Sequence, residues 1–264
     1  MDGGRTTSAV NGRLWGTSAE DWAGIQEATC RPVYQAVFDH VGLKGGERYL
    51  DAGCGAGLAA QMAAARGAQV FGLDAAENLL TIARSRVPDG EFHLGELESL
   101  PFSDGVFDVV TGFNSFQYAA NPGAALAEAR RVARSGAVVV VMTWGDPAGM
   151  EAASLVGALR PLLPAPPPGA PGPFALSDEA ALRAFVSGAG LEPLDLLEVD
   201  APWRYADLAT ALRGVGSSGV AARARENSGA EAVDEAHAKA FAAFRQPDGG
   251  YLVRARFRCL VSRA

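Results

Sequence analysis

An acidic residue followed by three glycines is the part of the sequence best suited to binding a ligand. Residues 50–59 read LDAGCGAGLA and contain Asp51, Gly53, Gly55 and Gly57. An apolar run precedes this segment and a helical pattern follows it, so the glycines fall at a strand-to-helix turn. Glycine permits a positive φ angle there and lets a ligand approach the backbone closely. The Asp51 carboxylate, at the tip of the strand, could hold a polar or cationic group of that ligand.

A second acid, Asp74, ends the next apolar run, residues 68–73. A carboxylate at the end of the second strand of such a unit can accept hydrogen bonds from ribose hydroxyls. The two acids and the glycine-rich turn between them therefore predict a site for a cofactor of the adenosine type.

The composition is that of a globular protein. The chain has 264 residues, of which 48% are apolar and 20% charged, enough for one large α/β domain or a domain with an insertion. A net charge of −7 argues against binding nucleic acid without sequence preference. No run of about 18 apolar residues occurs, so we expect no membrane partner. The three cysteines (Cys30, Cys54 and Cys259) are far apart, which predicts a reduced, cytoplasmic chain without a metal site.

Strand and helix patterns alternate from residue 47 onward, as a parallel sheet requires. The expected strands are residues 48–50, 69–73, 92–94, 106–111, 137–143, 191–199 and 251–262. Asn121 followed by Pro122 predicts the start of a helix. Two helical segments lie outside this alternation. They are an N-terminal arm, residues 1–46, with a helical pattern over residues 19–41, and an insertion at about residues 205–246.

Five segments in a fixed order resemble a known family. They are LDAGCGAGLA, Asp74, GELESLPF at residues 95–102, FDVV at 107–110 and RRVARSG at 130–136. In this order they resemble the class I S-adenosylmethionine-dependent methyltransferases of the small-molecule type. The resemblance covers about residues 47–144. It implies S-adenosyl-L-methionine as the cofactor and an α/β, Rossmann-like core, residues 47–264. We expect a seven-stranded, mostly parallel sheet with an antiparallel last strand, and the arm and the insertion as a lid.

The resemblance also implies two groups of cofactor contacts. Residues that would surround the methionine part are Asp51, Gly53, Gly55, Phe113, Asn114 and, from the arm, Tyr34. Residues that would hold the nucleoside are Asp74, Ala75, Glu96 and Leu97. Asp74 would bind the ribose hydroxyls. Glu96 stands where the family usually has an aspartate, so the contact to the adenine amino group departs from the pattern.

Methyl transfer needs alignment and exclusion of water more than it needs a proton acceptor. We find no clear general base, and the candidates for a catalytic role are His237, Gln117 and Tyr118. Gln117 cannot act as a base at neutral pH and would orient the acceptor. The residues expected to line the acceptor are Trp15, Trp22, Gln117, Tyr118 and Trp144. The expected partner is a small molecule, a secondary metabolite such as an antibiotic precursor, and the chain is expected to be a monomer or a homodimer.

Other functions remain open beside methyl transfer. A nicotinamide dehydrogenase would carry a third glycine three positions after Gly55, where this chain has Leu58. That difference disfavours a dinucleotide site. The other two alternatives keep the cofactor. One is a natural-product enzyme with non-methylating chemistry such as a cyclisation, and the other is a non-catalytic regulator that binds the cofactor.

Overall fold

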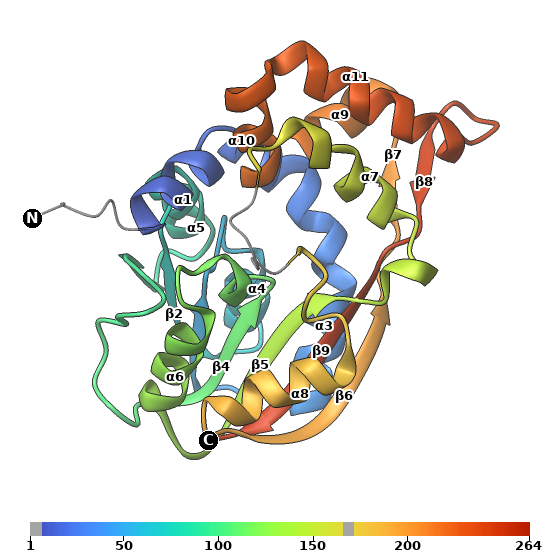
Figure 1. The fold of residues 1–264 in the computed structure, drawn as a ribbon. Helices are drawn as coiled ribbons and strands as arrows, with labels where there is room; N and C mark the ends of the chain where they lie inside the picture. Colours follow the sequence, from blue (N-terminus) through green and yellow to red (C-terminus); the bar gives the residue numbers. More distant parts are fainter. Residues whose placement is uncertain (1–6, 166–171) are drawn as a thin grey trace, which may run out of the picture.

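The computed structural model describes residues 7–165 and 172–264, which are built around one seven-stranded sheet (Figure 1). The strand order is β3-β2-β1-β4-β5-β9-β6. The strands of this sheet are β1 (Arg48–Ala52), β2 (Gln69–Asp74), β3 (Glu91–Leu94), β4 (Phe107–Phe113), β5 (Ala133–Trp144), β6 (Glu192–Asp200) and β9 (Arg256–Arg263). Strands β1 to β5 pair in parallel, whereas β9 runs antiparallel to both β5 and β6. The predicted fold class is confirmed.

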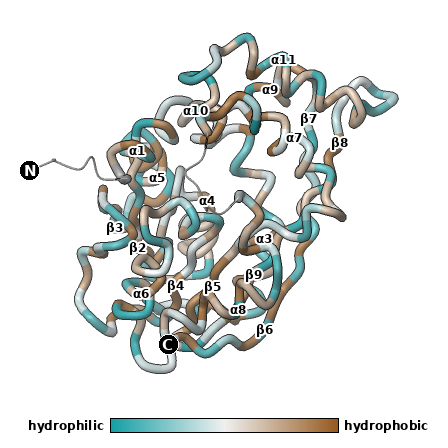
Figure 2. Tube along the Cα trace, viewed as in Figure 1, coloured by the Kyte–Doolittle hydropathy of each residue, from teal (hydrophilic) through white to brown (hydrophobic). Residues whose placement is uncertain are grey.

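Helices cover both faces of the sheet and bury two separate apolar cores. One face is covered by α3 (Arg31–Val41), α4 (Leu58–Ala64) and α5 (Glu77–Arg86), and the other by α6 (Pro122–Val132) and α8 (Glu179–Gly188). Figure 2 shows apolar stretches along the central strands β4 and β5, which are buried on both faces. Such strands are expected to be apolar almost throughout. The Asn121 side chain caps α6 by accepting from Ala124 N, as the sequence predicts.

The arm is less regular than the sequence suggests. It consists of α1 (Thr7–Gly16), α2 (Ala19–Asp21), a π-helical turn η1 (Trp22–Gln26), a 3₁₀ turn η2 (Glu27–Cys30) and α3. The single helix expected over residues 19–41 is therefore wrong before Arg31. Glu27, at the junction of the π and 3₁₀ turns, forms an ion pair with Arg86, 59 residues along the chain. Local periodicity cannot show a contact of that range.

The final strand, expected over residues 251–262, is divided in two. The first part, β8 (Tyr251–Val253), leaves the main sheet and pairs with β7 (Trp203–Tyr205) in a two-stranded sheet. Between β8 and β9 the Arg254 N donates to the Glu151 carboxylate, at 2.7 Å, and not to a neighbouring strand. The prediction of one continuous strand was wrong at this point.

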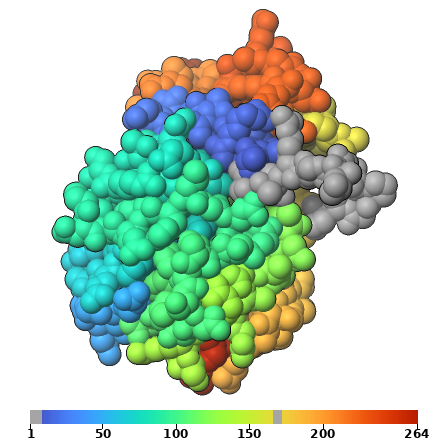
Figure 3. All heavy atoms as spheres, turned by 90° about the vertical axis from the view of Figure 1, so that its left-hand side faces the viewer, coloured from blue at the N-terminus to red at the C-terminus, as the bar shows by residue number. Residues whose placement is uncertain are grey.

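Three helices, α9 (Leu208–Gly216), α10 (Gly219–Ser228) and α11 (Ala230–Phe241), make up most of the insertion. The remaining short elements are α7 (Ala152–Ala158) and the 3₁₀ turns η3 (Phe116–Tyr118), η4 (Pro147–Gly149), η5 (Arg160–Leu162) and η6 (Ala242–Phe244). Figure 3 shows α1 of the arm (blue) between the core (teal and green) and the insertion (orange). No helix in the described part of the chain is both long and apolar enough to cross a membrane.

Candidate functional site

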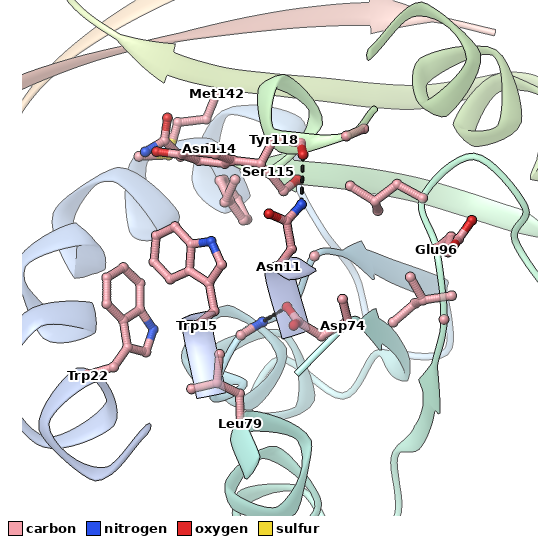
Figure 4. Close-up of a pocket in the computed structure, with 18 of the residues that line it drawn as sticks. Asn11, Trp15, Trp22, Asp74, Leu79, Glu96, Asn114, Ser115, Tyr118 and Met142 are labelled. Atoms are coloured by element: carbon pink, nitrogen blue, oxygen red, sulfur yellow. Dashed lines mark hydrogen bonds between the residues drawn. The ribbon is translucent and has the colours of Figure 1, made fainter. Parts of the chain in front are cut away.

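A cavity lies at the carboxyl ends of β1, β2 and β4, under the arm (Figure 4). It contains about 910 Å³ of space between atoms, including its opening to solvent. Twelve residues singled out from the sequence line it: Trp15, Trp22, Tyr34, Gly53, Gly55, Asp74, Ala75, Glu96, Leu97, Phe113, Asn114 and Tyr118. Residues that the sequence analysis missed are Asn11, Cys30, Leu73, Leu79, Gly95, Glu98, Ser115, Ala119 and Met142. Ligands are expected at this edge of an open α/β sheet.

The glycine turn has the positive φ angles expected from its sequence. The φ angles of Gly53, Gly55 and Gly57 are 81°, 54° and 80°. A Cβ on Gly55 would lie 3.5 Å from Trp22 Nε1, and one on Gly57 would lie 2.7 Å from Ala83 Cβ of α5. The turn is therefore packed between the arm and α5. A side chain at either position would be strained by the positive φ, and at Gly57 it would also collide with α5.

Asp74 faces the cavity from the end of β2. Its Oδ2 accepts from Gly55 N at 2.8 Å and its Oδ1 accepts from Ala76 N at 2.9 Å. Burial raises the pKa of this carboxyl, and the backbone donors oppose the rise. Each carboxylate oxygen has a second lone pair, so Asp74 can still accept from a ligand hydroxyl.

Asp51 lies beneath the cavity and does not line it. Its side chain is buried, and Thr111 Oγ1 donates to Oδ1 at 3.4 Å. Burial first, and then the neighbouring carboxylates of Glu27 and Asp74, raise the pKa of Asp51 to about 8. A cationic ligand group above the turn would favour the ionised form.

Glu27 is a buried acid that joins three elements. Its carboxylate pairs with Arg86 at 2.5 Å, and its Oε1 accepts from Leu58 N at the start of α4 at 3.2 Å. Arg86 donates further to the carbonyls of Ala56 and Ala23. The arm, the glycine turn and α5 are thus connected by one network. The sequence feature that could have indicated Glu27 is an acidic residue inside the apolar helical pattern of the arm.

Aromatic side chains of the arm form the roof of the cavity. The Trp15 ring contacts Trp22 and Tyr118 edge to face, with centroids 5.0 and 5.4 Å apart. Asn11 Nδ2 donates to Tyr118 O at 2.8 Å, which connects α1 to the loop after β4. In that loop Asn114 has a φ of 56°. A positive φ at a residue other than glycine is a strained conformation that often occurs at functional sites.

Besides Asp51, three more of the predicted residues lie outside the cavity lining. Gln117 donates to Asn114 Oδ1, and its own Oε1 is buried without a partner in the described residues. Trp144 stacks on Phe257 in the core, with ring centroids 4.9 Å apart. His237 is buried in α11, and burial lowers its pKa to about 4. The residues described include no group of three His, Cys, Asp or Glu side chains that could hold a metal ion.

Comparison with known families identifies the core. Residues 50–141 match the model of the methyltransferase domain family. Residues 50–141 are a methyltransferase domain of the class I S-adenosylmethionine-dependent type. The cofactor implied by this family is S-adenosyl-L-methionine. The match spans the glycine turn, Asp74 and the strands up to β5, which form the floor of the cavity, and it does not include the arm.

Two curated relatives resemble this domain in sequence. A malonyl-[acyl-carrier protein] O-methyltransferase from Serratia marcescens is 39% identical over 98 residues, which are 37% of this chain and 38% of the relative. A demethylmenaquinone methyltransferase from Renibacterium salmoninarum is 36% identical over 111 residues, 42% of this chain and 47% of the relative. The matched region is therefore less than half of each relative.

Solved structures share the fold at low sequence identity. The YcgJ protein from Bacillus subtilis superposes with a TM-score of 0.57 at 20% identity, covering 88% of this chain and 98% of that one. The [4+2]-cyclase SpnF superposes with a TM-score of 0.53 at 20% identity, covering 88% and 79%. At this level of identity the methyltransferase-domain fold is what the proteins share.

Proposed function

We propose that the protein transfers the methyl group of S-adenosyl-L-methionine to a small-molecule acceptor, which we expect to be a secondary metabolite. The observation that supports this proposal is the cavity itself. It joins the glycine turn and Asp74 on its floor to an aromatic roof supplied by the arm. A floor of this kind suits the cofactor, and a roof of this kind suits an apolar acceptor that must be kept from water.

The residues at the floor fit the nucleoside part of the cofactor. Asp74 has free lone pairs toward the cavity for the ribose hydroxyls. Ala75, Glu96 and Leu97 line the cavity beside it, where the adenine would lie. Glu96 is therefore proposed to accept from the adenine amino group despite its longer side chain.

The methionine part would lie over the glycine turn. Gly53 and Gly55 allow close approach there, and the Asp51 carboxylate beneath them offers a negative charge to the ammonium group. Phe113 and Asn114 at the end of β4, and Tyr34 from the arm, complete the proposed contacts.

The cofactor supplies an activated methyl group on a sulfonium, so the task of the protein is alignment and exclusion of water. Trp22 lies next to Gly55, and Trp15 packs on Trp22 in the cavity wall, so we propose that these two rings exclude water from the reacting centre. Burial raises the pKa of Tyr118 to about 12. At neutral pH its hydroxyl stays protonated and can donate a hydrogen bond to the acceptor. It does not serve as the general base.

Single-turnover incubation with methyl-labelled cofactor and a panel of phenols, amines and enols tests this function. We expect label in one acceptor class, with a product heavier by one methylene and an equal amount of S-adenosylhomocysteine. A product isomeric with the acceptor, formed while the cofactor stays intact, would instead support a cyclisation. Tight cofactor binding without turnover on any acceptor would support a regulator.

A further inference from the structure

The insertion does not line the cavity in the described part of the chain. The lining residues come from the arm and from the core up to Met142, and α9, α10 and α11 contribute none. The helices of the insertion lie on the other side of the arm (Figure 3). The helices α9 and α10 contact η1 and α1 of the arm, which contribute Trp22, Asn11 and Trp15 to the cavity wall.

The arm and the insertion interlock through both polar and close apolar contacts. Tyr205 Oη donates to the buried Gln26 Oε1 at 2.8 Å. Arg213 pairs with Asp21 at 2.5 Å, and Arg13 pairs with Glu226. These contacts fix the position of the arm relative to α9 and α10.

The closest approach is that of Gly219 to Trp15. Gly219 is the first residue of α10, after the N-cap Ser218. A Cβ on Gly219 would lie 2.6 Å from Trp15 Nε1 and 2.7 Å from both Cδ1 and Cε2. The indole ring therefore packs directly against the α-carbon. A Cβ at position 219 could be accommodated only if the indole ring moved, since Cβ contacts under 3.0 Å are essentially never seen.

Trp15 also forms part of the cavity wall above the glycine turn. It lies between Trp22, whose Nε1 is near Gly55, and Tyr118 after β4 (Figure 4). One side of the indole packs against α10 and the ring lines the cavity. A ring displaced away from α10 would enter the space over the turn.

We propose that Gly219 is a positioning residue that sets, through Trp15, the size of the chamber beside the sulfonium. The insertion thereby limits the size of the group that fits at the reacting centre, although none of its described residues lines the cavity. This inference rests on the proposed function, because the proposed cofactor orientation places the sulfonium over the glycine turn.

A series of ligands that differ only in the group on sulfur measures the chamber directly. The series is S-adenosylhomocysteine, S-adenosylmethionine and S-adenosylethionine, which carry no group, a methyl and an ethyl. In Gly219→Ala we expect the affinity for S-adenosylhomocysteine to stay within about threefold and that for the ethyl ligand to fall at least about tenfold, because the displaced Trp15 ring would overpack the space that the ethyl group needs. Isothermal titration calorimetry gives all three affinities.

Two further variants make the test specific. Trp15→Leu should raise the affinity for S-adenosylethionine relative to that for S-adenosylhomocysteine. In the double variant Gly219→Ala with Trp15→Leu, the loss of affinity for S-adenosylethionine seen in Gly219→Ala should disappear. Gly157→Ala in α7 is the matched control, because a Cβ there meets nothing within 4 Å. If Gly219→Ala does not fold, the three affinities of Trp15→Leu still test the inference, because it predicts that the affinity for the ethyl ligand rises relative to that for S-adenosylhomocysteine.

Equal losses for all three ligands in Gly219→Ala, or an unchanged ethyl affinity there, would overturn the inference while leaving the proposed function intact. The same applies if Trp15→Leu leaves the ethyl preference unchanged. Failure of the unaltered protein to bind any of the three ligands would instead overturn the proposed function, and the inference with it.

Discussion

Three buried carboxylates surround the glycine turn. Glu27 lies on the arm side, Asp51 below the turn and Asp74 at the end of β2. Burial raises the pKa of all three, and Glu27 and Asp74 add to the rise at Asp51. The Arg86 guanidinium pairs with Glu27 and donates to two backbone carbonyls. A ligand with a positive charge over the turn would relieve this repulsion.

The affinity for S-adenosylhomocysteine should therefore depend on pH through Asp51. With a pKa of about 8, Asp51 is protonated at neutral pH in the free protein, and an ammonium group favours its ionised form. Binding then releases a proton below pH 8, so the affinity should rise with pH by up to about tenfold per unit and level off above pH 8. Calorimetry at several pH values, in buffers of different ionisation enthalpy, measures both effects. An identical pH slope in Asp51→Asn would contradict this assignment.

The buried Glu27–Arg86 pair should contribute far more to the free energy of unfolding than the exposed pair Glu77–Arg84, which lies in α5 like Arg86. Glu27→Gln leaves Arg86 uncompensated, and breaking a buried pair in this way costs about 3–5 kcal/mol. Glu77→Gln removes the partner of Arg84, where both side chains are more than 40% exposed, and should cost less than about 1 kcal/mol. Denaturant unfolding of the two variants compares them directly. Equal losses would show that Glu27 does not hold the arm to the core.

At the scale of elements, α11 contains a titratable group that should weaken it in acid. His237 is buried with its Nδ1 unpartnered among the described residues, and its pKa is lowered to about 4 by burial and by Arg225. The unfolded chain takes up this proton below about pH 6.5 and the folded chain only below about pH 4. The free energy of unfolding is therefore unaffected by this group above pH 6.5. It falls by about 3 kcal/mol as the pH is lowered from 6.5 to 4.

His237→Gln should flatten this part of the stability curve. Unfolding free energies at pH 7 and pH 4.5 measure the change, with the partly exposed His40→Gln as the control. If the two variants lose stability equally between these pH values, His237 does not titrate in this range.

Elements whose signals are local could be predicted from the sequence, and those fixed by distant contacts could not. The Asn121 cap and the turn at Gly53 to Gly57 follow from short-range chemistry. The π turn at residues 22–26 adjoins Glu27 and its contact with Arg86, and the break at Arg254 depends on Glu151. Neither partner lies within the same element, so periodicity could not reveal these features.

At the scale of the whole molecule, the sequence predicts the residues at the strand ends and the aromatic residues of the arm that line the cavity, but not the place of the insertion. Strand tips in a parallel sheet meet at one edge, which brings Asp74, Glu96 and Phe113 together as expected. The prediction for His237 depends on the insertion covering the acceptor. In the structure the arm covers the cavity, and the insertion packs against the arm, with Gly219 against Trp15. The packing of two helical segments against each other has no signature in either segment alone.

The central claim is that the cavity between the glycine turn and the arm binds S-adenosylmethionine through Asp74. Calorimetric titration with S-adenosylhomocysteine tests it most directly, using the unaltered protein, Asp74→Ala and the exposed control Asp89→Ala. We predict binding that NAD does not compete with, and a loss of at least about tenfold in Asp74→Ala alone, since each charge-assisted hydrogen bond contributes about 1.5–3 kcal/mol. Absence of binding to the unaltered protein, or equal affinity in all three, would contradict the account.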